Sequence, residues 1–479
     1  MSKNPPFPPS LLRSYGRASG QNLSARVARS KNLSDTVLFY TDVPRTFRST
    51  LIGYLYEIAR VFPVVLLAEE IDKETEKILL DKTFFPGLKE MIPIGQYSGT
   101  QGLRARHKRL FRLAKEAVKR HNPRIIIATG TYPFESYLRR LGKTNGATTI
   151  SGIGPIYGRT RERRAYHTLF SSYGKVPVSL PFFAKSAFIM LRKYAAHLLY
   201  YWILPLSVGQ RPFVTGPSFP FISRYGRYKT GADYYIVMLA GDREALVKEG
   251  IPRKKFLFVA HPLEGSSRTF LEKTYFASAK THVAAVKNHA AKNVLIVWPD
   301  VKMGFQKDTY AVIPQATIQK DRENILRIIL SCLPGWEISI KPHPTMTNIM
   351  PLKRMGKALS PLIRVTNPSD RVEDYIEASG CIIGVSPIST ALYTASLQCP
   401  QKPILSLDLQ KELMGDSFEG IEGIEYIDNE QRFRAILTTV EKGSYKKSPP
   451  VQAKEKFAGI VDAIEYMKRS SKFKVKSYS

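Results

Sequence analysis

Short apolar runs recur along this chain, and most intervals between them show the spacing of amphipathic helices. Runs rich in Val, Ile and Leu are typical of strands buried in a parallel sheet. They occupy residues 36–40, 64–67, 124–128, 147–150 and 233–238, and then 293–298, 337–340, 381–385 and 402–408. Strands that alternate with helices predict an α/β protein in which two doubly wound parallel sheets each form a Rossmann-like domain.

Changes in composition divide the chain into four parts. Residues 1–31 contain six Lys/Arg, no acidic residue and a cluster of prolines, so we expect a disordered basic arm there. The first Rossmann-like domain should cover residues 32–265 and the second residues 266–445. Residues 446–479 should form a C-terminal helix with a basic tail.

The segment Lys341-Pro-His-Pro344 places a lysine and a histidine on a stiff loop. Ile338 and Ile340 alternate with polar residues, as in a strand with one buried face, and the prolines are expected to end that strand. Ligands bind at the carboxyl ends of strands in open parallel sheets. Lys341 and His343 are therefore candidate ligand-binding residues, although an ordinary strand-to-helix turn carries the same residue types.

A hydroxyl-rich segment follows the apolar run at 381–385. Ser386 fits a helix N-cap, and Ser389 and Thr390 follow Pro387, which fits the first helical position. Backbone N–H groups and the helix dipole attract phosphate at such a helix start, although a plain N-cap has the same sequence. The interval between the two loops holds one βα unit, so both loops can face one cleft.

These two loops resemble those of bacterial GT-B glycosyltransferases with a His-Pro motif. Lys-Pro-His-Pro at 341–344, followed by Ser-x-x-Ser-Thr at 386–390, is similar to a group that includes bacterial sialyltransferases, capsule Kdo transferases and polymerases like the teichoic-acid glycerophosphotransferases. The resemblance implies a GT-B-like fold with an N-terminal acceptor domain, a C-terminal nucleotide-donor domain and a last helix that packs back on the first domain. It also implies that His343 contacts or protonates the leaving phosphate, and that Ser386, Ser389 and Thr390 bind that phosphate.

The expected activity is transfer of a sugar or alditol-phosphate from a nucleotide donor to a surface-glycan or lipid-linked acceptor, and the resemblance favours a cytidine nucleotide. His343, Lys341 and the helix start would stabilise the departing phosphate. No Asp-x-Asp sequence occurs, which disfavours a metal bound by such a motif. We also find no GxGxxG fingerprint, P-loop or zinc-ligand cluster, so we expect no cofactor and a metal-independent enzyme.

The general base is left open among Asp42, Glu135 and His167. Asp42 follows the first strand and Glu135 opens the helix after the strand at 124–128, although turn capping and a helix-start charge are their ordinary roles. The acidic Asp/Glu-Asp/Glu-Gly motif of sialyltransferase-like enzymes is missing from this sequence. His261, in a second His-Pro pair at a strand end, is a further candidate for the cleft.

A formal net charge of +32 points to polyanions, an anionic membrane surface or phosphorylated substrates as partners. A nucleic-acid-binding protein is one alternative, but no RRM, KH, zinc-finger or helix-turn-helix signature supports it, so nucleic acid is not an expected partner. A sugar-nucleotide epimerase of the same fold is the other alternative. Such an enzyme would release a soluble sugar and would need neither an acceptor nor a membrane face.

Residues 177–217 form an apolar insertion whose few charges are basic. The part at 194–210 has no charged residue and contains Pro205, and its length is near the lower limit of a membrane span. Burial within the domain, a helix in the bilayer interface and a span are all compatible with this pattern. The arm at 1–31 lacks the apolar core of a secretory signal, and the three cysteines fit free thiols in a reducing compartment. We therefore expect a cytoplasmic protein, peripheral on the inner face of the plasma membrane.

Overall fold

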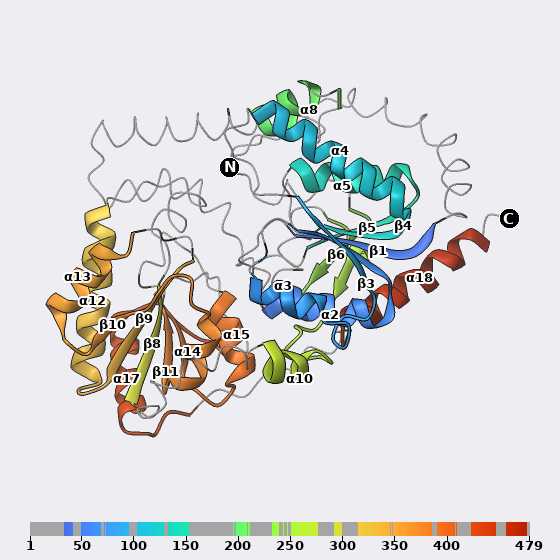
Figure 1. Ribbon diagram of the computed structural model, residues 1–479. Coiled ribbons are helices and arrows are strands. Elements are labelled where there is room, and N and C mark those ends of the chain that lie inside the picture. The colour runs from blue at the N-terminus through green and yellow to red at the C-terminus, as the bar shows by residue number, and fades with distance from the viewer. Residues whose placement is uncertain are drawn as a thin grey trace, which may run out of the picture.

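The computed structural model describes two parallel sheets, each lying between layers of helices (Figure 1). The described residues are 33–41, 49–68, 71, 73–94, 103–128, 133–152, 195, 198–207, 209–210, 232–238, 243, 247, 251–275, 292–298, 315–344, 346, 348–385, 390–407, 409, 423–446 and 457–476. The predicted α/β architecture with two doubly wound sheets is confirmed.

The first sheet has the order β3-β2-β1-β4-β5-β6-β7, and all its strand pairs are parallel. Its strands are β1 (Ser34–Thr41), β2 (Val64–Ala68), β3 (Leu88–Pro93), β4 (Pro123–Ala128), β5 (Thr148–Gly152), β6 (Tyr234–Val237) and β7 (Phe256–Phe258). The helices between its first five strands are α2 (Ser49–Val61), α3 (Lys73–Leu80), α4 (Leu103–His121) and α5 (Pro133–Thr144). The chain starts in the middle of this sheet and reverses direction between β1 and β4, which makes that pair the topological switch point.

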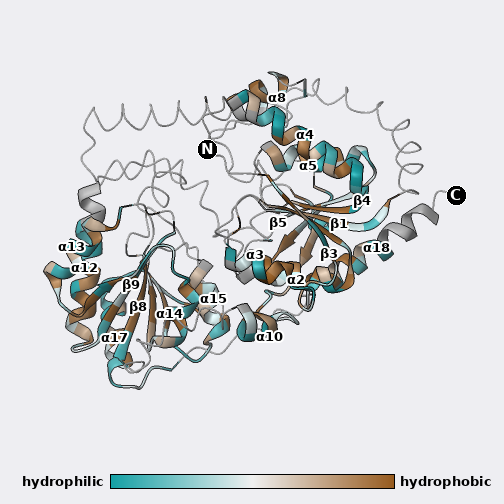
Figure 2. Ribbon diagram, viewed as in Figure 1, coloured by the Kyte–Doolittle hydropathy of each residue, from teal (hydrophilic) through white to brown (hydrophobic). Residues whose placement is uncertain are grey.

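Successive residues of the central strand β1 enter two different cores, because side chains alternate across a sheet. Val37 and Phe39 pack with α2 on one face, whereas Leu38 and Tyr40 pack with α4 and α5 on the other. Figure 2 shows the same division, with apolar strands between helices that carry polar residues. A strand covered on both faces is apolar throughout, which is why these runs were recognisable in the sequence.

The second sheet has the order β10-β9-β8-β11-β12-β13 and is also parallel throughout. Its strands are β8 (Asn293–Trp298), β9 (Glu337–Pro342), β10 (Ile363–Val365), β11 (Cys381–Gly384), β12 (Ile404–Leu407) and β13 (Glu425–Ile427). The helices that accompany it are α12 (Gln315–Cys332), α13 (Met350–Leu359), α14 (Val372–Ala378), α15 (Thr390–Gln398) and α17 (Glu430–Glu441). Its switch point lies between β8 and β11. The predicted domain boundary near residue 265 lies between β7 and β8, and its position stays a prediction.

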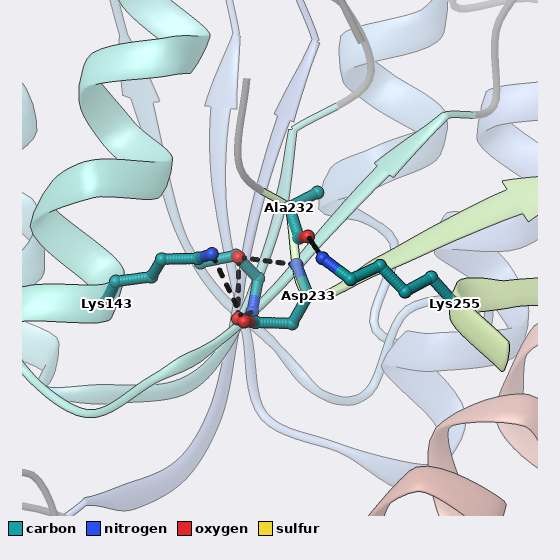
Figure 3. Close-up of polar contacts among 5 residues, drawn as sticks. Lys143, Ala232, Asp233 and Lys255 are labelled. Atoms are coloured by element: carbon teal, nitrogen blue, oxygen red, sulfur yellow. Dashed lines mark hydrogen bonds and ion pairs between the residues drawn. The ribbon is translucent and has the colours of Figure 1, made fainter. Parts of the chain in front are cut away.

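A polar clamp fixes β6 beside β5 where the chain returns to the first sheet (Figure 3). Asp233 Oδ2 accepts hydrogen bonds from the backbone N of Thr149 at 2.9 Å and from its hydroxyl at 2.8 Å. Lys143 Nζ lies 3.2 Å from the other carboxylate oxygen, and Lys255 Nζ donates to the carbonyl of Ala232 at 3.3 Å. These bonds lie at the amino ends of β5 and β6, so their role is to hold the strands in register rather than to meet a ligand.

In the described part of the 177–217 insertion, some side chains pack against the core and others are exposed at the surface. It forms a π-helical turn at Leu199–Ile203 and the short helix α8 (Leu204–Ser207). Trp202 packs against the core under α4, whereas Ile203 and Leu206 are exposed. No helix within the described ranges is both long and apolar enough to span a bilayer.

The C-terminal helix α18 (Ile460–Lys476) packs on the first sheet, beside α2 (Figure 1). Ile460, Ala463, Ile464 and Met467 belong to the same core as α2. The expected return of the last helix to the N-terminal half is therefore observed. It follows from amphipathic spacing, because these four side chains share one face of the helix.

Glu57 on α2 anchors the start of α18. It is 4% exposed, and its Oε2 accepts a hydrogen bond from the backbone N of Ile460 at 3.0 Å. Its Oε1 accepts from the Ser267 hydroxyl at 2.9 Å. Burial raises the pKa of the Glu57 carboxyl, while the hydrogen bonds from Ile460 and Ser267 act in the opposite direction. A carboxylate at a helix N-terminus satisfies a backbone donor and complements the helix dipole.

We expect Gly459→Ala to destabilise the protein, because a Cβ at Gly459 would lie 2.6 Å from Glu57 Oε2. Forcing a methyl group into a packed site costs about 1–3 kcal/mol of the free energy of unfolding. Chemical denaturation followed by circular dichroism measures this change, and Ala458→Ser at the exposed neighbouring position is the control. Equal stability of the two variants would show that Glu57 does not hold the start of α18 in this way.

Candidate functional site

The carboxyl edge of the second sheet brings the two predicted loops close together. Lys341 in β9 and Gly384 in β11 both pair with Val297 of the central strand β8, so the three residues form one row across the sheet. Neighbouring strands are about 4.8 Å apart, which places the ends of β9 and β11 about 10 Å from each other. This edge includes the switch point of the sheet, where open α/β folds bind their ligands.

His343 lies directly after β9 and is half-buried. Its backbone carbonyl accepts a hydrogen bond from the N–H of Met346 at 2.9 Å, so the chain turns immediately after the strand. The sequence analysis ended the strand at the Lys-Pro-His-Pro segment, but β9 continues through Pro342, which pairs with Trp298. The correction leaves His343 as the first residue beyond the strand, at the ligand edge.

Lys341 is buried at 3% exposure, and its ammonium is held by backbone carbonyls. Nζ donates to the carbonyl of Pro342 at 2.7 Å and to that of Pro368 at 3.0 Å. Pro368 belongs to the segment after β10, so this lysine joins two loops on the carboxyl side of the sheet. The bonds fix the backbone next to His343, and the predicted contact of Lys341 with phosphate stays a prediction.

Helix α15 begins at Thr390 and packs closely on the strand that precedes it. A Cβ at Gly384 would lie 2.5 Å from Leu392 Cδ1, so a larger residue at the end of β11 would displace the Leu392 side chain. The glycine thus lets the first turn of α15 lie against the end of the strand. Ser386, Ser389 and the side chain of Thr390 fall outside the described residues, and their contact with phosphate stays a prediction.

A third cation near this edge was not recognised in the sequence. Arg322 on α12 is 4% exposed, and its guanidinium carbon lies 5.2 Å from the ring centroid of Trp298, the last residue of β8. A guanidinium over an aromatic face is held by cation–π attraction. Nothing in the spacing of α12 distinguishes this arginine from its exposed basic neighbours, so only the fold identifies it.

The carboxyl edge of the first sheet carries a buried carboxylate and a buried guanidinium. Glu135, in the first turn of α5, has no exposed surface, and Arg139, one turn later, is 1% exposed. Arg139 Nη1 lies 3.3 Å from the carbonyl of Ala128, at the end of β4, and 3.4 Å from the Ser151 hydroxyl in β5. The sequence analysis selected Glu135 but missed Arg139, although spacing of four residues places both on one helix face. The role of Glu135 as a base stays a prediction.

His261 lies where the two halves of the molecule touch. Its ring is 1% exposed and meets the ring of Tyr393 on α15 edge to face, with centroids 5.3 Å apart. Its Nδ1 accepts a hydrogen bond from the N–H of Leu263 at 3.1 Å. The neighbouring Tyr54 donates to the carbonyl of Ala260 at 2.7 Å. Burial, reinforced by Glu57, Tyr393 and Glu264, raises the pKa of Tyr54 well above its ordinary value.

Two further candidates, Asp42 and His167, lie outside the described residues. Within the described part of the chain, no cluster of three or more His, Cys, Asp or Glu side chains could hold a metal ion. The geometry therefore places Lys341, His343 and the start of α15 at one edge, Glu135 at the corresponding edge of the first sheet, and His261 at the junction.

No protein-family model and no curated protein sequence matches this chain. Solved structures do match it. UDP-GlcNAc 2-epimerase from Methanocaldococcus jannaschii is 10% identical with a TM-score of 0.54, over 90% of this chain and 99% of that one. A putative UDP-N-acetylglucosamine 2-epimerase from Listeria monocytogenes is 11% identical with a TM-score of 0.51, over 88% and 93%. UDP-GlcNAc 2-epimerase from Neisseria meningitidis, bound to UDP-GlcNAc, is 12% identical with a TM-score of 0.51, over 91% and 98%.

At these identities the similarity shows the fold. Together with the two parallel sheets, it confirms the expected GT-B-like fold of two Rossmann-like domains. The similarity covers 90% of this chain and 99% of the Methanocaldococcus jannaschii chain.

We expect Lys341→Met to loosen the loop that carries His343. Methionine is unbranched and one atom shorter than lysine, and it leaves the carbonyls of Pro342 and Pro368 without these donors. An unsatisfied buried acceptor costs about 1–3 kcal/mol. Chemical denaturation should therefore show a lower free energy of unfolding for Lys341→Met. The control Lys357→Met, at an exposed position on α13, should leave the free energy of unfolding unchanged. Unchanged stability combined with weaker nucleotide binding would contradict this structural role and would favour direct contact of Lys341 with a ligand.

Proposed function

We propose that this protein is a nucleotide-sugar-dependent glycosyltransferase. It would transfer a sugar or an alditol-phosphate from a nucleotide donor, preferably a cytidine nucleotide, to a surface-glycan or lipid-linked acceptor. The observation that carries the proposal is the place of His343, directly beyond β9 at the carboxyl edge of the second sheet in a GT-B-like fold. The two segments that carry the resemblance, Lys-Pro-His-Pro and Ser-x-x-Ser-Thr, follow β9 and β11 in the sequence. These two strands are the neighbours of β8 in the sheet.

The proposed chemistry needs one proton donor and one proton acceptor. In sugar transfer, the acceptor oxygen bonds to the anomeric carbon as the bond from that carbon to the donor phosphate oxygen breaks. His343 would protonate or hydrogen-bond the departing phosphate, and the N-terminus of α15 would stabilise its charge. A base would take the proton of the acceptor hydroxyl, and Asp42, Glu135 and His167 remain the candidates for that role. In alditol-phosphate transfer the acceptor oxygen bonds to phosphorus instead, as the bond from that phosphorus to the oxygen of the departing nucleotide phosphate breaks, with the same two proton transfers.

Peripheral binding to an anionic membrane is part of the proposal, because a lipid-linked acceptor is held at the bilayer surface. The formal net charge of +32 supports it. The exposed aliphatic side chains of the 177–217 insertion support it as well.

A sugar-nucleotide epimerase is the second candidate. The structures with TM-scores of 0.5 or more reported above are described as UDP-GlcNAc 2-epimerases, and one of them is bound to UDP-GlcNAc. An epimerase would use the same nucleotide edge but would need no acceptor. Nucleic-acid binding, the remaining alternative, is favoured only by charge.

Thermal shift against CMP, CDP, UDP, GDP and TDP distinguishes the first two candidates. A ligand that binds only the folded protein stabilises it by about 2.7 kcal/mol at a hundred times its dissociation constant. We expect cytidine nucleotides to raise the melting temperature most. A shift with UDP and none with CMP or CDP would contradict the cytidine donor and favour the epimerase. Random oligonucleotides, added over a range of salt concentrations, test the nucleic-acid alternative in the same assay.

His343→Ala should reduce turnover by about 10²–10⁴-fold, the usual contribution of a positioned acid. Nucleotide affinity should fall less than turnover, because the proton is delivered in the transition state. Ser386→Ala should show the opposite balance and lose affinity more than rate. Steady-state kinetics and nucleotide titrations measure both effects, and melting curves with His343→Gln control for folding. Near-normal turnover of a folded His343→Ala variant would show that His343 is not the general acid.

A further inference from the structure

Five basic residues form a stripe along the outer face of α4. They are Arg104, Lys108, Arg112, Lys115 and Lys119, and all five are exposed. Their spacings of four, four, three and four residues place them on one face of the helix. A different face of the helix is buried in the core of the first sheet through Leu110, Phe111, Ala114, Ala117 and Val118. The stripe is about 22 Å long at a rise of about 1.5 Å per residue.

The described residues neutralise the charges of this stripe only in part. Glu116 is the single acidic residue of α4, and its carboxylate lies 3.7 Å from Arg112 Nε. Lys108, Lys115 and Lys119 form no ion pair with another residue of the described ranges. Like charges one helical turn apart repel each other, so the stripe lowers helix stability unless an external anion binds along it.

Two exposed aliphatic side chains lie at the N-terminal end of the same stripe. Ile203 is 55% exposed and Leu206 is 56% exposed. Arg104, the first residue of the stripe, donates a hydrogen bond from Nη2 to the carbonyl of Ser207 at 3.1 Å, which fixes α8 beside α4. Figures 1 and 2 show α8 next to the N-terminal end of α4. Trp202 packs into the core below, so this segment is held in place with its aliphatic pair exposed.

We propose that this stripe, together with Ile203 and Leu206, is a docking surface for anionic lipid headgroups; we call it the α4–α8 surface. The Lys and Arg side chains would face the phosphates, and the two aliphatic side chains would enter the boundary between headgroups and acyl chains. Nucleic acid would satisfy the stripe but would leave the aliphatic pair without a use, so the combination favours lipid. The inference rests on the proposed membrane association and identifies the surface responsible for it.

The test is co-sedimentation of the full chain with vesicles of phosphatidylcholine mixed with phosphatidylglycerol, compared with pure phosphatidylcholine vesicles. One basic residue near an anionic surface contributes about 1 kcal/mol, so Lys108→Gln, Lys115→Gln and Lys119→Gln combined should weaken binding on the order of 100-fold. The matched control is Lys353→Gln, Arg354→Gln and Lys357→Gln combined, which removes the same charge from exposed positions on α13. It should bind nearly as the unaltered protein does. Ile203→Ser with Leu206→Ser should weaken binding on the order of tenfold, with less dependence on salt.

Three outcomes would overturn the proposal. The unaltered protein could ignore the anionic vesicles at low salt, or the two triple variants could lose binding equally, which would show an effect of net charge alone. The serine variant could bind vesicles as well as the unaltered protein while random oligonucleotides compete for the stripe, which would make it a polyelectrolyte site. The thermal shift with nucleotides should be the same in all these variants, so failure of the docking surface and failure of the proposed catalytic site are distinguishable.

Discussion

The hydrogen bonds of one buried carboxylate determine how the two halves of this protein are connected. Glu57 accepts hydrogen bonds from the backbone N–H of Ile460, at the start of the last helix, and from the hydroxyl of Ser267, just after the first sheet. Beside it, Val259 and Phe457 form a parallel bridge, so the segment that leaves the first sheet and the segment that returns to it run side by side. The second sheet is thus connected to the first by two adjacent segments of the chain rather than by one. A buried acid with three elements around it is costly to leave unsatisfied, which makes this connection specific.

The same junction links the carboxyl edge of the second sheet to the first domain. Tyr393 and Leu397 lie on α15, the helix whose N-terminus is the proposed phosphate site. Tyr393 contacts His261, and Leu397 packs against the core of the first sheet as well as its own. Any shift of α15 on binding a phosphate would therefore change contacts at the junction. Under the proposed function, this coupling would let the two halves adjust to a bound donor.

The sequence was sufficient for the central strands and insufficient for the edges of the sheets. β1, β4, β8 and β11 are covered on both faces, and their apolar runs were recognisable without any structure. The strands β3, β10 and β13 were missed because each is short or half-exposed and has no continuous apolar run. β9 was predicted too short, since Pro342 pairs at the very end of a ladder, where a missing N–H is tolerated.

Candidate site residues were predictable where sequence position determines location, and not where tertiary packing does. His343 was found because a residue just beyond a strand must lie at the sheet edge. Arg139 and Arg322 were missed because formal charge does not reveal burial, and only the fold places them under 5% exposure.

The same distinction separates the two uses of positive charge in this protein. Lys341 and Arg322 are immobilised by carbonyls and by an aromatic ring near one edge, so their positions are fixed before any ligand arrives. In the proposed donor site, fixed charges would suit a single phosphate at a defined place. The lysines of α4 are exposed, and in the proposed docking surface their effect would be additive over a surface rather than specific to one group. The net charge of +32 therefore combines buried and exposed cations, and burial, which the sequence does not state, distinguishes the two kinds.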